Sequence, residues 1–341
     1  MRSLLWTVSP QAYSVVTYAF SSRALATNPL GDPAERLVTL LLPPGYDQRR
    51  AYPHVWMLPA FGASGRSFLN FSPSGEDLVE RVTRLQRAGQ IGSMVFVLPD
   101  TFTALGGNQH IDSEGVGAYA TYIWDELLPF VEERHPASAR AVAGRSSGGY
   151  GALVSAMRRP GLFAAAVCHS GDMGFELCFL PDMGHLLREV ARAGGVAAFR
   201  EALVGWRTRR PSASWRAAQN LFAMAATYSP NPAADGGVDL PVDLYTGEIR
   251  QDVWGRWLGH DPLRMVCRRE EAEALRGLRL LFFDCGEWDE FNLLYGARQL
   301  ARKLDRLGIP HLFETFDDGH MDTSYRWDRS LPLVWEVLRK V

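Results

Sequence analysis

The sequence contains very little lysine and carries almost no net charge. Lys303 and Lys340 are the only lysines among 36 basic residues, and 38 acidic residues bring the formal net charge to −2. Nucleic acids and anionic membranes attract proteins with an excess of basic charge. We therefore expect neither of them as a partner.

Cysteine is scarce as well. The four cysteines form no C-x-x-C pair, and each lies in an apolar stretch. This pattern predicts four buried, reduced thiols and hence a cytoplasmic protein. No group of His, Cys, Asp and Glu has the spacing of metal ligands, so we expect no metal and no other cofactor. The cysteines are Cys168, Cys178, Cys267 and Cys285.

Long apolar runs are missing too. No segment approaches the ~18 consecutive apolar residues that a membrane span requires. The N-terminal Leu4, Leu5 and Trp6 are not followed by the longer apolar stretch of a secretory signal, so we predict none. A mature form from which a signal had been removed would look the same.

Short apolar runs alternating with helical patterns fill most of the 341 residues. A hydrophobic content of 47% with 22% charged residues suits a globular protein with a large core. The alternation predicts an α/β fold, a mostly parallel doubly wound sheet with helices on both faces. Residues 6–26 resemble antiparallel edge strands. Further strands are expected at 37–42, 55–58, 94–98, 141–143, 164–168, 278–283 and 311–316, and helices at 117–134, 149–159, 292–307 and 331–338.

One region interrupts this alternation. Residues 171–275 lie between two expected strands and are far longer than an ordinary connection. They contain helical stretches separated by glycine and proline. We therefore expect one domain over 1–341 with a cap-like insertion at 171–275.

The strand expected at 141–143 leads into the most informative motif. Gly144, Ser146 and Gly148 form Gly-x-Ser-x-Gly between a strand and a helix. In this context the pattern is typical of a nucleophile elbow, a sharp turn that exposes a serine hydroxyl above a parallel sheet. The three-residue pattern alone arises by chance in roughly one chain of this length in five. The interpretation therefore depends on finding a base, an acid and an oxyanion site elsewhere in the sequence.

A serine nucleophile needs a base. His320 follows the last expected strand, in a loop at the sheet edge where α/β sites lie. The base needs a carboxylate to orient it. Asp289, in the loop after strand 278–283, comes in the expected chain order and is favoured. Glu287 and Asp284 remain alternatives.

The reaction also needs N–H donors for the developing oxyanion. One should be the backbone of Ser147, and the other should come from the loop 58–65. We favour Phe61 as the second donor, with Gly62 as the fallback. Gly62, Asn108, Arg145 and Trp288 are candidates for lining the pocket. For Arg145 a surface ion pair is favoured over binding a substrate carboxylate.

Together these segments resemble the esterase branch of the α/β hydrolases, which includes esterase D (S-formylglutathione hydrolase), feruloyl esterases, enterochelin esterase and the antigen 85 mycolyltransferases. The resemblance implies an α/β-hydrolase fold with Ser146, Asp289 and His320 as a catalytic triad. Relatives often carry His-Gly where this chain has Pro59 and Ala60. The matching segments are 28–32, 42–47, 58–62, 144–152, 169–172, 284–291 and 318–320.

Three functions remain open at this stage. The first is a serine carboxylesterase that hydrolyses small-molecule esters through an acyl-enzyme. The second is an acyltransferase that uses the same triad to pass the acyl group to a sugar or alcohol. The third is a binding scaffold without catalysis. A homo-oligomer is compatible with the sequence.

Overall fold

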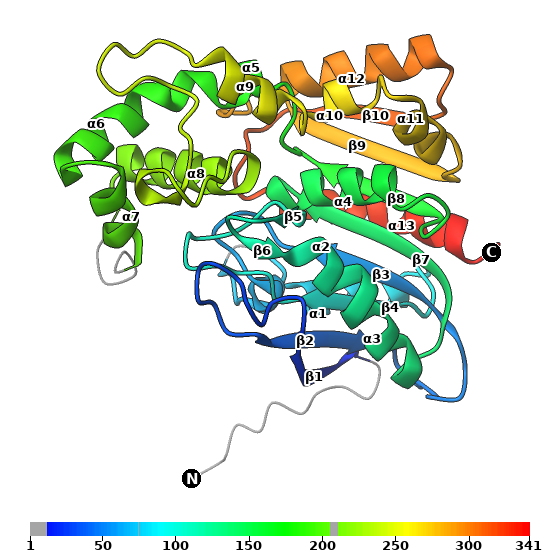
Figure 1. Cartoon of the computed structure of the whole chain (residues 1–341). Coiled ribbons are helices and arrows are strands. Elements are labelled where there is room, and N and C mark those ends of the chain that lie inside the picture. The colour runs from blue at the N-terminus through cyan, green and yellow to red at the C-terminus, as the bar shows by residue number, and fades with distance from the viewer. Residues whose placement is uncertain (1–11, 74, 205–210) are drawn as a thin grey trace.

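An eight-stranded sheet forms the centre of the protein. The structure, a computed structural model, describes residues 12–73, 75–204 and 211–341. The strands lie in the order β1-β2-β4-β3-β7-β8-β9-β10, from the bottom to the top of Figure 1. Their bounds are Ser14–Ser21 (β1), Glu35–Leu42 (β2), Tyr52–Leu58 (β3), Val95–Pro99 (β4), Ala137–Arg145 (β7), Ala165–His169 (β8), Leu280–Gly286 (β9) and Leu312–Phe316 (β10).

The sheet is antiparallel at one edge and parallel elsewhere. β1 pairs antiparallel with β2, and β2 pairs antiparallel with β4. From β4 through β3, β7, β8 and β9 to β10, every pairing is parallel. The α/β-hydrolase fold predicted from the sequence is thereby confirmed, and so is the antiparallel edge. Residues 1–11, part of the expected edge strands, lie outside the described residues.

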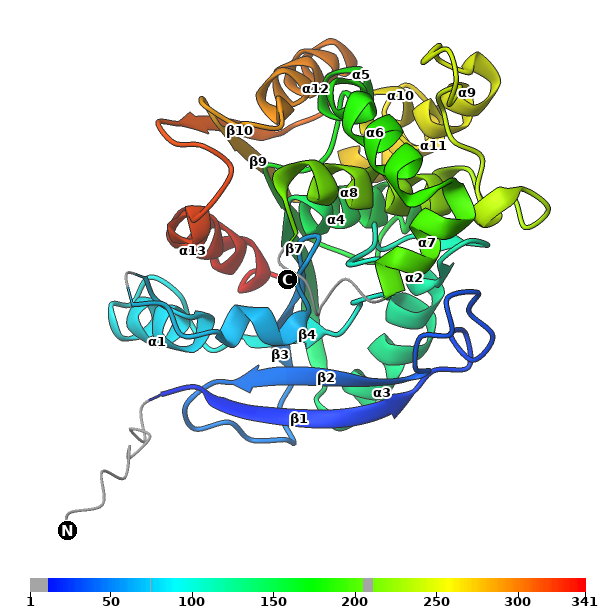
Figure 2. The ribbon, with the colours of Figure 1, turned by 90° about the vertical axis from the view of Figure 1, so that its left-hand side faces the viewer.

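Helices cover both faces of the sheet, as Figure 2 shows. α1 (Leu78–Arg87) and α13 (Trp327–Leu338) pack on one face. The opposite face carries α4 (Ser147–Arg158), α12 (Leu293–Leu307) and a helix that runs from α2 (Tyr119–Thr121) through a π-helical turn at Tyr122–Leu127 into α3 (Leu128–Arg134). The helix expected at 117–134 thus begins two residues late, because Gly117–Ala118 (β6) pairs with Asp112–Ser113 (β5).

The segment between β8 and β9 is helical. Figure 1 shows α6, α7 and α8 grouped beyond one end of the sheet. No helix in the described ranges is long and apolar enough to cross a membrane. The helices of this segment are Phe175–Cys178 (α5), Met183–Ala193 (α6), Val196–Val204 (α7), Ala213–Tyr228 (α8), Gln251–Leu258 (α9), Pro262–Met265 (α10) and Arg269–Arg276 (α11).

The four cysteines are free thiols, but one expectation about them was wrong. Cys168, Cys178 and Cys285 are buried, whereas Cys267 is exposed. Cys267 follows the short helix α10 at the surface, and the ammonium group of Lys303 lies 3.5 Å from its sulfur. Its apolar neighbours Met265 and Val266 are the residues that point into the core.

Candidate active site

Ser146 stands in a strained turn between β7 and α4. Its φ of 56° and ψ of −127° lie in a region that non-glycine residues rarely occupy. The flanking glycines are required by close backbone contacts. A Cβ on Gly144 would overlap the carbonyl of Gly148, and a Cβ on Gly148 would overlap the carbonyl of Leu58. The Gly-x-Ser-x-Gly motif therefore has the sharp strand–turn–helix geometry that the sequence predicts for an elbow.

Hydrogen bonds from both sides hold the backbone of this turn. The Ser146 N–H donates to the carbonyl of His169, at the end of β8, over 2.9 Å. The Ser146 carbonyl accepts the N–H of Tyr150, also at 2.9 Å, within the first turn of α4. The elbow is thus tied to the neighbouring strand and to the helix that follows it.

Asp289 and His320 form a buried pair. Oδ2 of Asp289 lies 2.8 Å from Nδ1 of His320, and both side chains are almost completely buried. The other carboxylate oxygen, Oδ1, accepts the N–H groups of Phe291, just before α12, and of Leu293, its first residue. With Oδ1 held in this way, Oδ2 is left to fix the orientation of the imidazole. This is the contact that a base and its orienting acid require.

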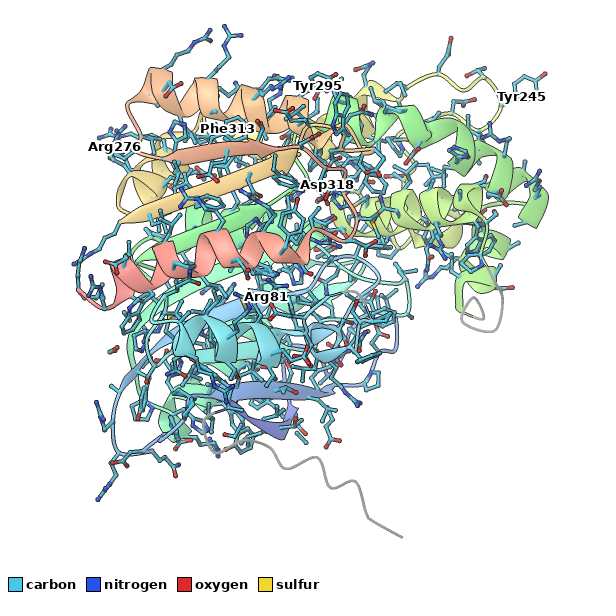
Figure 3. All side chains as sticks on the ribbon, turned by 180° about the vertical axis from the view of Figure 1, so that it is seen from behind. Arg81, Tyr245, Arg276, Tyr295, Phe313 and Asp318 are labelled. Carbon is cyan, nitrogen blue, oxygen red and sulfur yellow. The ribbon has the colours of Figure 1, made fainter. Side chains whose placement is uncertain are left out.

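The loops that carry these two residues are joined by hydrogen bonds. Oε2 of Glu290 accepts the N–H of His320 at 2.7 Å, and the Trp288 N–H donates to the carbonyl of Asp318 at 3.0 Å. Asp318, labelled in Figure 3, marks this loop at the end of β10. The position of His320 therefore depends on the loop after β9 as well as on its own.

The sheet topology brings the candidate residues to one edge. The loops bearing Phe61, Ser146, Asp289 and His320 leave the carboxyl ends of β3, β7, β9 and β10, which belong to one parallel run. Arg145 also links the elbow to the histidine loop, because its guanidinium donates to the carbonyl of His320 at 3.2 Å. Sites in open α/β sheets form at this edge.

Arg145 departs from the expectation of a surface ion pair. Its side chain is half-buried and donates to Thr323 Oγ1 as well as to the His320 carbonyl. Burial lowers the pKa of this guanidinium. Arg145 also borders a cavity of about 260 Å³, which Pro59 and Ala60 line as well. The hydrogen bond to the His320 carbonyl holds the Arg145 side chain against the histidine loop.

The loop after β3 distinguishes between the two candidate oxyanion donors. The N–H of Gly62, the fallback donor, already donates a hydrogen bond to the carbonyl of Gly106 at 2.7 Å. His110, two residues after the pocket candidate Asn108, supports this loop. Its Nε2 lies 2.9 Å from the carbonyl oxygen of Pro59, and burial lowers the pKa of His110 to about 4. The imidazole is therefore neutral at pH 7 and donates to Pro59 through Nε2.

The alternative acids are engaged elsewhere. Asp284 is buried between Nδ1 of His169, at 2.7 Å, and the guanidinium of Arg326, at 2.8 Å. Glu287 accepts a hydrogen bond from Thr315 Oγ1 at 2.8 Å. Neither carboxylate takes the place beside His320 that Asp289 holds.

Two of the pocket candidates have other contacts. The amide of Asn108 is buried, donating to the Thr101 carbonyl and accepting the His110 N–H, so it braces its own loop. The ring of Trp288 is largely exposed, and its Nε1 donates to Asp317 at 2.7 Å. A Cβ on Gly62 would meet no atom within 4 Å, so open space lies beside this residue.

A second buried carboxylate near the elbow was also missed by sequence reasoning. Asp172 follows β8, and its Oδ2 accepts a hydrogen bond from Nε2 of Gln109 at 2.8 Å. Burial raises the pKa of Asp172, while hydrogen bonds from Gln109 and Ser147 and the proximity of His320 oppose that shift. The sequence places Asp172 in segment 169–172, one of those that carry the family resemblance, but assigns it no role. No group of three or more metal-ligating side chains occurs among the residues that the structure describes.

Comparisons with known proteins agree with this geometry. A family model described as "Putative esterase" matches residues 33–332. The chain belongs to this esterase family. Esterase Rv1288 of Mycobacterium tuberculosis is 30% identical over 238 residues, which cover 63% of this chain and 46% of that protein. The chain therefore spans about half the length of this curated relative.

Solved structures show the same fold. A ferulic acid esterase is 20% identical with a TM-score of 0.62, covering 96% of this chain and 99% of the other. An S-formylglutathione hydrolase from Agrobacterium tumefaciens is 15% identical with a TM-score of 0.58 and covers 96% of both chains. The resemblance to the esterase branch of the α/β hydrolases, drawn from the sequence, is confirmed.

Proposed function

We propose that this member of the esterase family is a serine carboxylesterase acting on small-molecule esters. The observation that carries the proposal is the buried Asp289–His320 pair, held at the same sheet edge as the strained turn of Ser146. A strained serine turn, a base and an orienting acid in this chain order are the parts that ester hydrolysis by a serine enzyme needs.

In the first half of the reaction, Ser146 Oγ attacks the ester carbonyl and Nε2 of His320 takes the hydroxyl proton. Asp289 keeps the Nδ1 proton of His320 directed at its own carboxylate, which leaves Nε2 free to act as the base. The backbone N–H groups of Ser147 and Phe61 stabilise the oxyanion, each by roughly 3–4 kcal/mol. His320 then returns the proton to the leaving alcohol, and the acyl group remains on Ser146.

In the second half, water replaces the alcohol. His320 takes a proton from the water as it attacks the acyl-enzyme, and the acid leaves as Ser146 recovers its proton. The same oxyanion donors serve both halves. No step in this scheme calls for a metal or another cofactor.

We further propose that the chain acts as one domain and that the insertion at 171–275 shapes the substrate pocket. The insertion begins directly after β8, the strand whose last carbonyl holds the Ser146 N–H. Its helices therefore start beside the elbow. The cytoplasmic location remains a prediction from the cysteine content.

Labelling with a fluorophosphonate tests this function directly. The reagent reacts with an activated serine, so we expect one adduct, on the peptide that contains Ser146. The Ser146→Ala variant should take up no label, whereas Ser138→Ala, which changes an exposed serine on the preceding strand β7, should be labelled like the wild type. A stable adduct on any other serine would contradict the proposal. Products that contain a transferred acyl group, in the presence of an added alcohol, would point to the acyltransferase instead.

A further inference from the structure

Asp172 is a carboxylate beside the elbow that the proposed mechanism does not use. It is 9% exposed and is held by Nε2 of Gln109 at 2.8 Å, which is itself only 1% exposed. Buried carboxylates usually face a cation or several backbone N–H groups, because taking the charge out of water costs free energy. Among the described residues, Asp172 forms no ion pair within 4 Å with a basic side chain.

The backbone places Asp172 beside the first turn of α4. A Cβ on Gly149, in the first turn of α4, would lie 3.1 Å from the Cα of Gly171. The loop that leads into Asp172 therefore packs directly on the turn that starts with Ser147, the expected oxyanion donor. His320 and Ser147 are both close enough to influence the ionisation of Asp172.

Asp261 shows what a structural carboxylate in the same insertion looks like. It is completely buried, and it accepts the backbone N–H groups of Gly174, Phe175 and Leu263 at distances from 2.9 to 3.1 Å. These contacts cap helices and account for its burial. Asp172 receives its hydrogen bonds from side chains around the site instead, so helix capping does not explain its burial.

Gln109 carries an acceptor that lacks a donor. Its Nε2 donates to Asp172, but its Oε1 is buried and has no hydrogen-bond partner among the described residues. The carboxylate of Asp172 and the amide oxygen of Gln109 together leave more acceptors than donors at this point of the site. Such an imbalance is corrected by a ligand that brings N–H or O–H groups.

We propose that Asp172, supported by Gln109, binds a hydrogen-bond donor of the substrate, so that the preferred esters carry a hydroxyl or ammonium group close to the scissile bond. This inference rests on the proposed esterase function. A site that hydrogen-bonds a substrate donor discriminates against the analogue that lacks it, because its own polar groups are then left without partners. Asp172 is thus assigned as a specificity-determining residue.

A matched series of esters tests the assignment. Propyl butyrate lacks a donor, propyl β-hydroxybutyrate carries a hydroxyl and propyl β-aminobutyrate carries an ammonium group. Ethylene glycol monobutyrate places the hydroxyl on the alcohol side. We expect at least one donor-bearing ester to exceed propyl butyrate in kcat/KM by about 10- to 100-fold, as one hydrogen bond to a charged group provides. Equal kcat/KM values across the series would overturn the inference.

Variants identify the residue responsible. Asp172→Asn keeps the size of the side chain and removes its charge, so the difference between the esters should shrink to less than about threefold. Gln109→Met, which removes the supporting donor, should shrink it as well. Asp182→Asn makes the same change at a half-buried carboxylate elsewhere in the insertion and should preserve the wild-type preference. A preference that persists in Asp172→Asn would overturn the assignment.

Labelling by the fluorophosphonate distinguishes a failure of the esterase function from a failure of the role of Asp172. If Ser146 is labelled but the ester series shows no preference, the esterase function stands and the role of Asp172 falls. If Ser146 is not labelled and no ester is hydrolysed, the proposed function fails and the inference fails with it.

Discussion

Nε2 of His110 lies 2.9 Å from the carbonyl oxygen of Pro59, two residues before the expected oxyanion donor Phe61. Family relatives often carry His-Gly at the positions that Pro59 and Ala60 occupy here. In this chain, a histidine from a distant segment contacts the same loop. The imidazole also packs against α4, since a Cβ on Gly151 would lie 2.6 Å from its ring. His110 therefore connects the oxyanion loop to the helix that begins at the elbow.

Removing this connection should lower catalysis. His110→Phe keeps a ring of similar size but cannot donate to Pro59, so the loop loses its anchor and the Phe61 N–H shifts. We expect kcat to fall about 10- to 100-fold with a smaller change in KM. His311→Phe is the matched control, because Nδ1 of His311 also bonds a carbonyl, that of Ile309, just before β10. Equal losses in both variants would contradict the role of His110.

Glu290 offers a test of how His320 is positioned. Its Oε2 accepts the His320 N–H at 2.7 Å, so Glu290→Ala should release the histidine loop and lower kcat about tenfold. Glu290→Gln keeps an acceptor oxygen and should retain most of the activity. Glu287→Ala removes a neighbouring carboxylate that bonds only Thr315 among the described side chains, and kcat should stay near the wild-type value. A Gln variant as impaired as the Ala variant would show that charge, rather than the hydrogen bond, matters.

The elbow should tolerate no side chain at Gly148. Gly148→Ala places a methyl group on the carbonyl of Leu58, and we expect at least 1–3 kcal/mol of destabilisation, roughly the range for overpacking. Gly255→Ala is the control, since a Cβ there meets no atom within 4 Å and alanine favours the helix α9 by about 1 kcal/mol. Urea unfolding of both variants measures the difference. Equal stability of the two would contradict the close approach in the elbow.

The pH dependence of stability should report on Asp172. Burial raises its pKa in the folded protein, so the folded state holds the proton more tightly than the unfolded chain does. Below the unfolded value of about 3.9, both states are protonated and the residue imposes no penalty. The penalty grows as pH rises from there through the folded pKa, and then stays constant.

Asp172→Asn removes the ionisable group, so it should raise the free energy of unfolding at pH 7 relative to the wild type. The gain should vanish below about pH 3. Denaturant titrations of the two proteins across this range measure the difference. A gain that is the same at both ends of the range would show that the carboxylate ionises as freely in the folded protein as in the unfolded chain.

The sequence predicted those parts of the site that depend on local backbone geometry and chain order. Gly144 and Gly148 mark the elbow because only glycine fits the close contacts there, and these contacts lie within a few residues or on the adjacent strand. The pairing of Asp289 with His320 followed from their places after successive parallel strands. Parallel strands end at the same sheet edge, so residues that follow different strands can meet there even when they are far apart in the chain.

Contacts between loops could not be predicted in this way. Whether Gly62 or Phe61 has a free N–H depends on the carbonyl of Gly106, which arrives from a different loop. Arg145 looked like a surface residue because nothing local shows that the His320 carbonyl will face it. Asp172 is unusual because its carboxylate is buried beside the elbow. The sequence does not show which aspartates are buried.

In the proposed function, Ser146 is the nucleophile, and Asp289 and His320 activate it. The most direct measurement is the hydrolysis of p-nitrophenyl acetate by Ser146→Ala, with circular dichroism to show that the variant is folded. We expect kcat/KM to fall by at least about 1,000-fold, since every step of the proposed reaction passes through the nucleophile. A folded Ser146→Ala protein within about tenfold of the wild-type rate would contradict it.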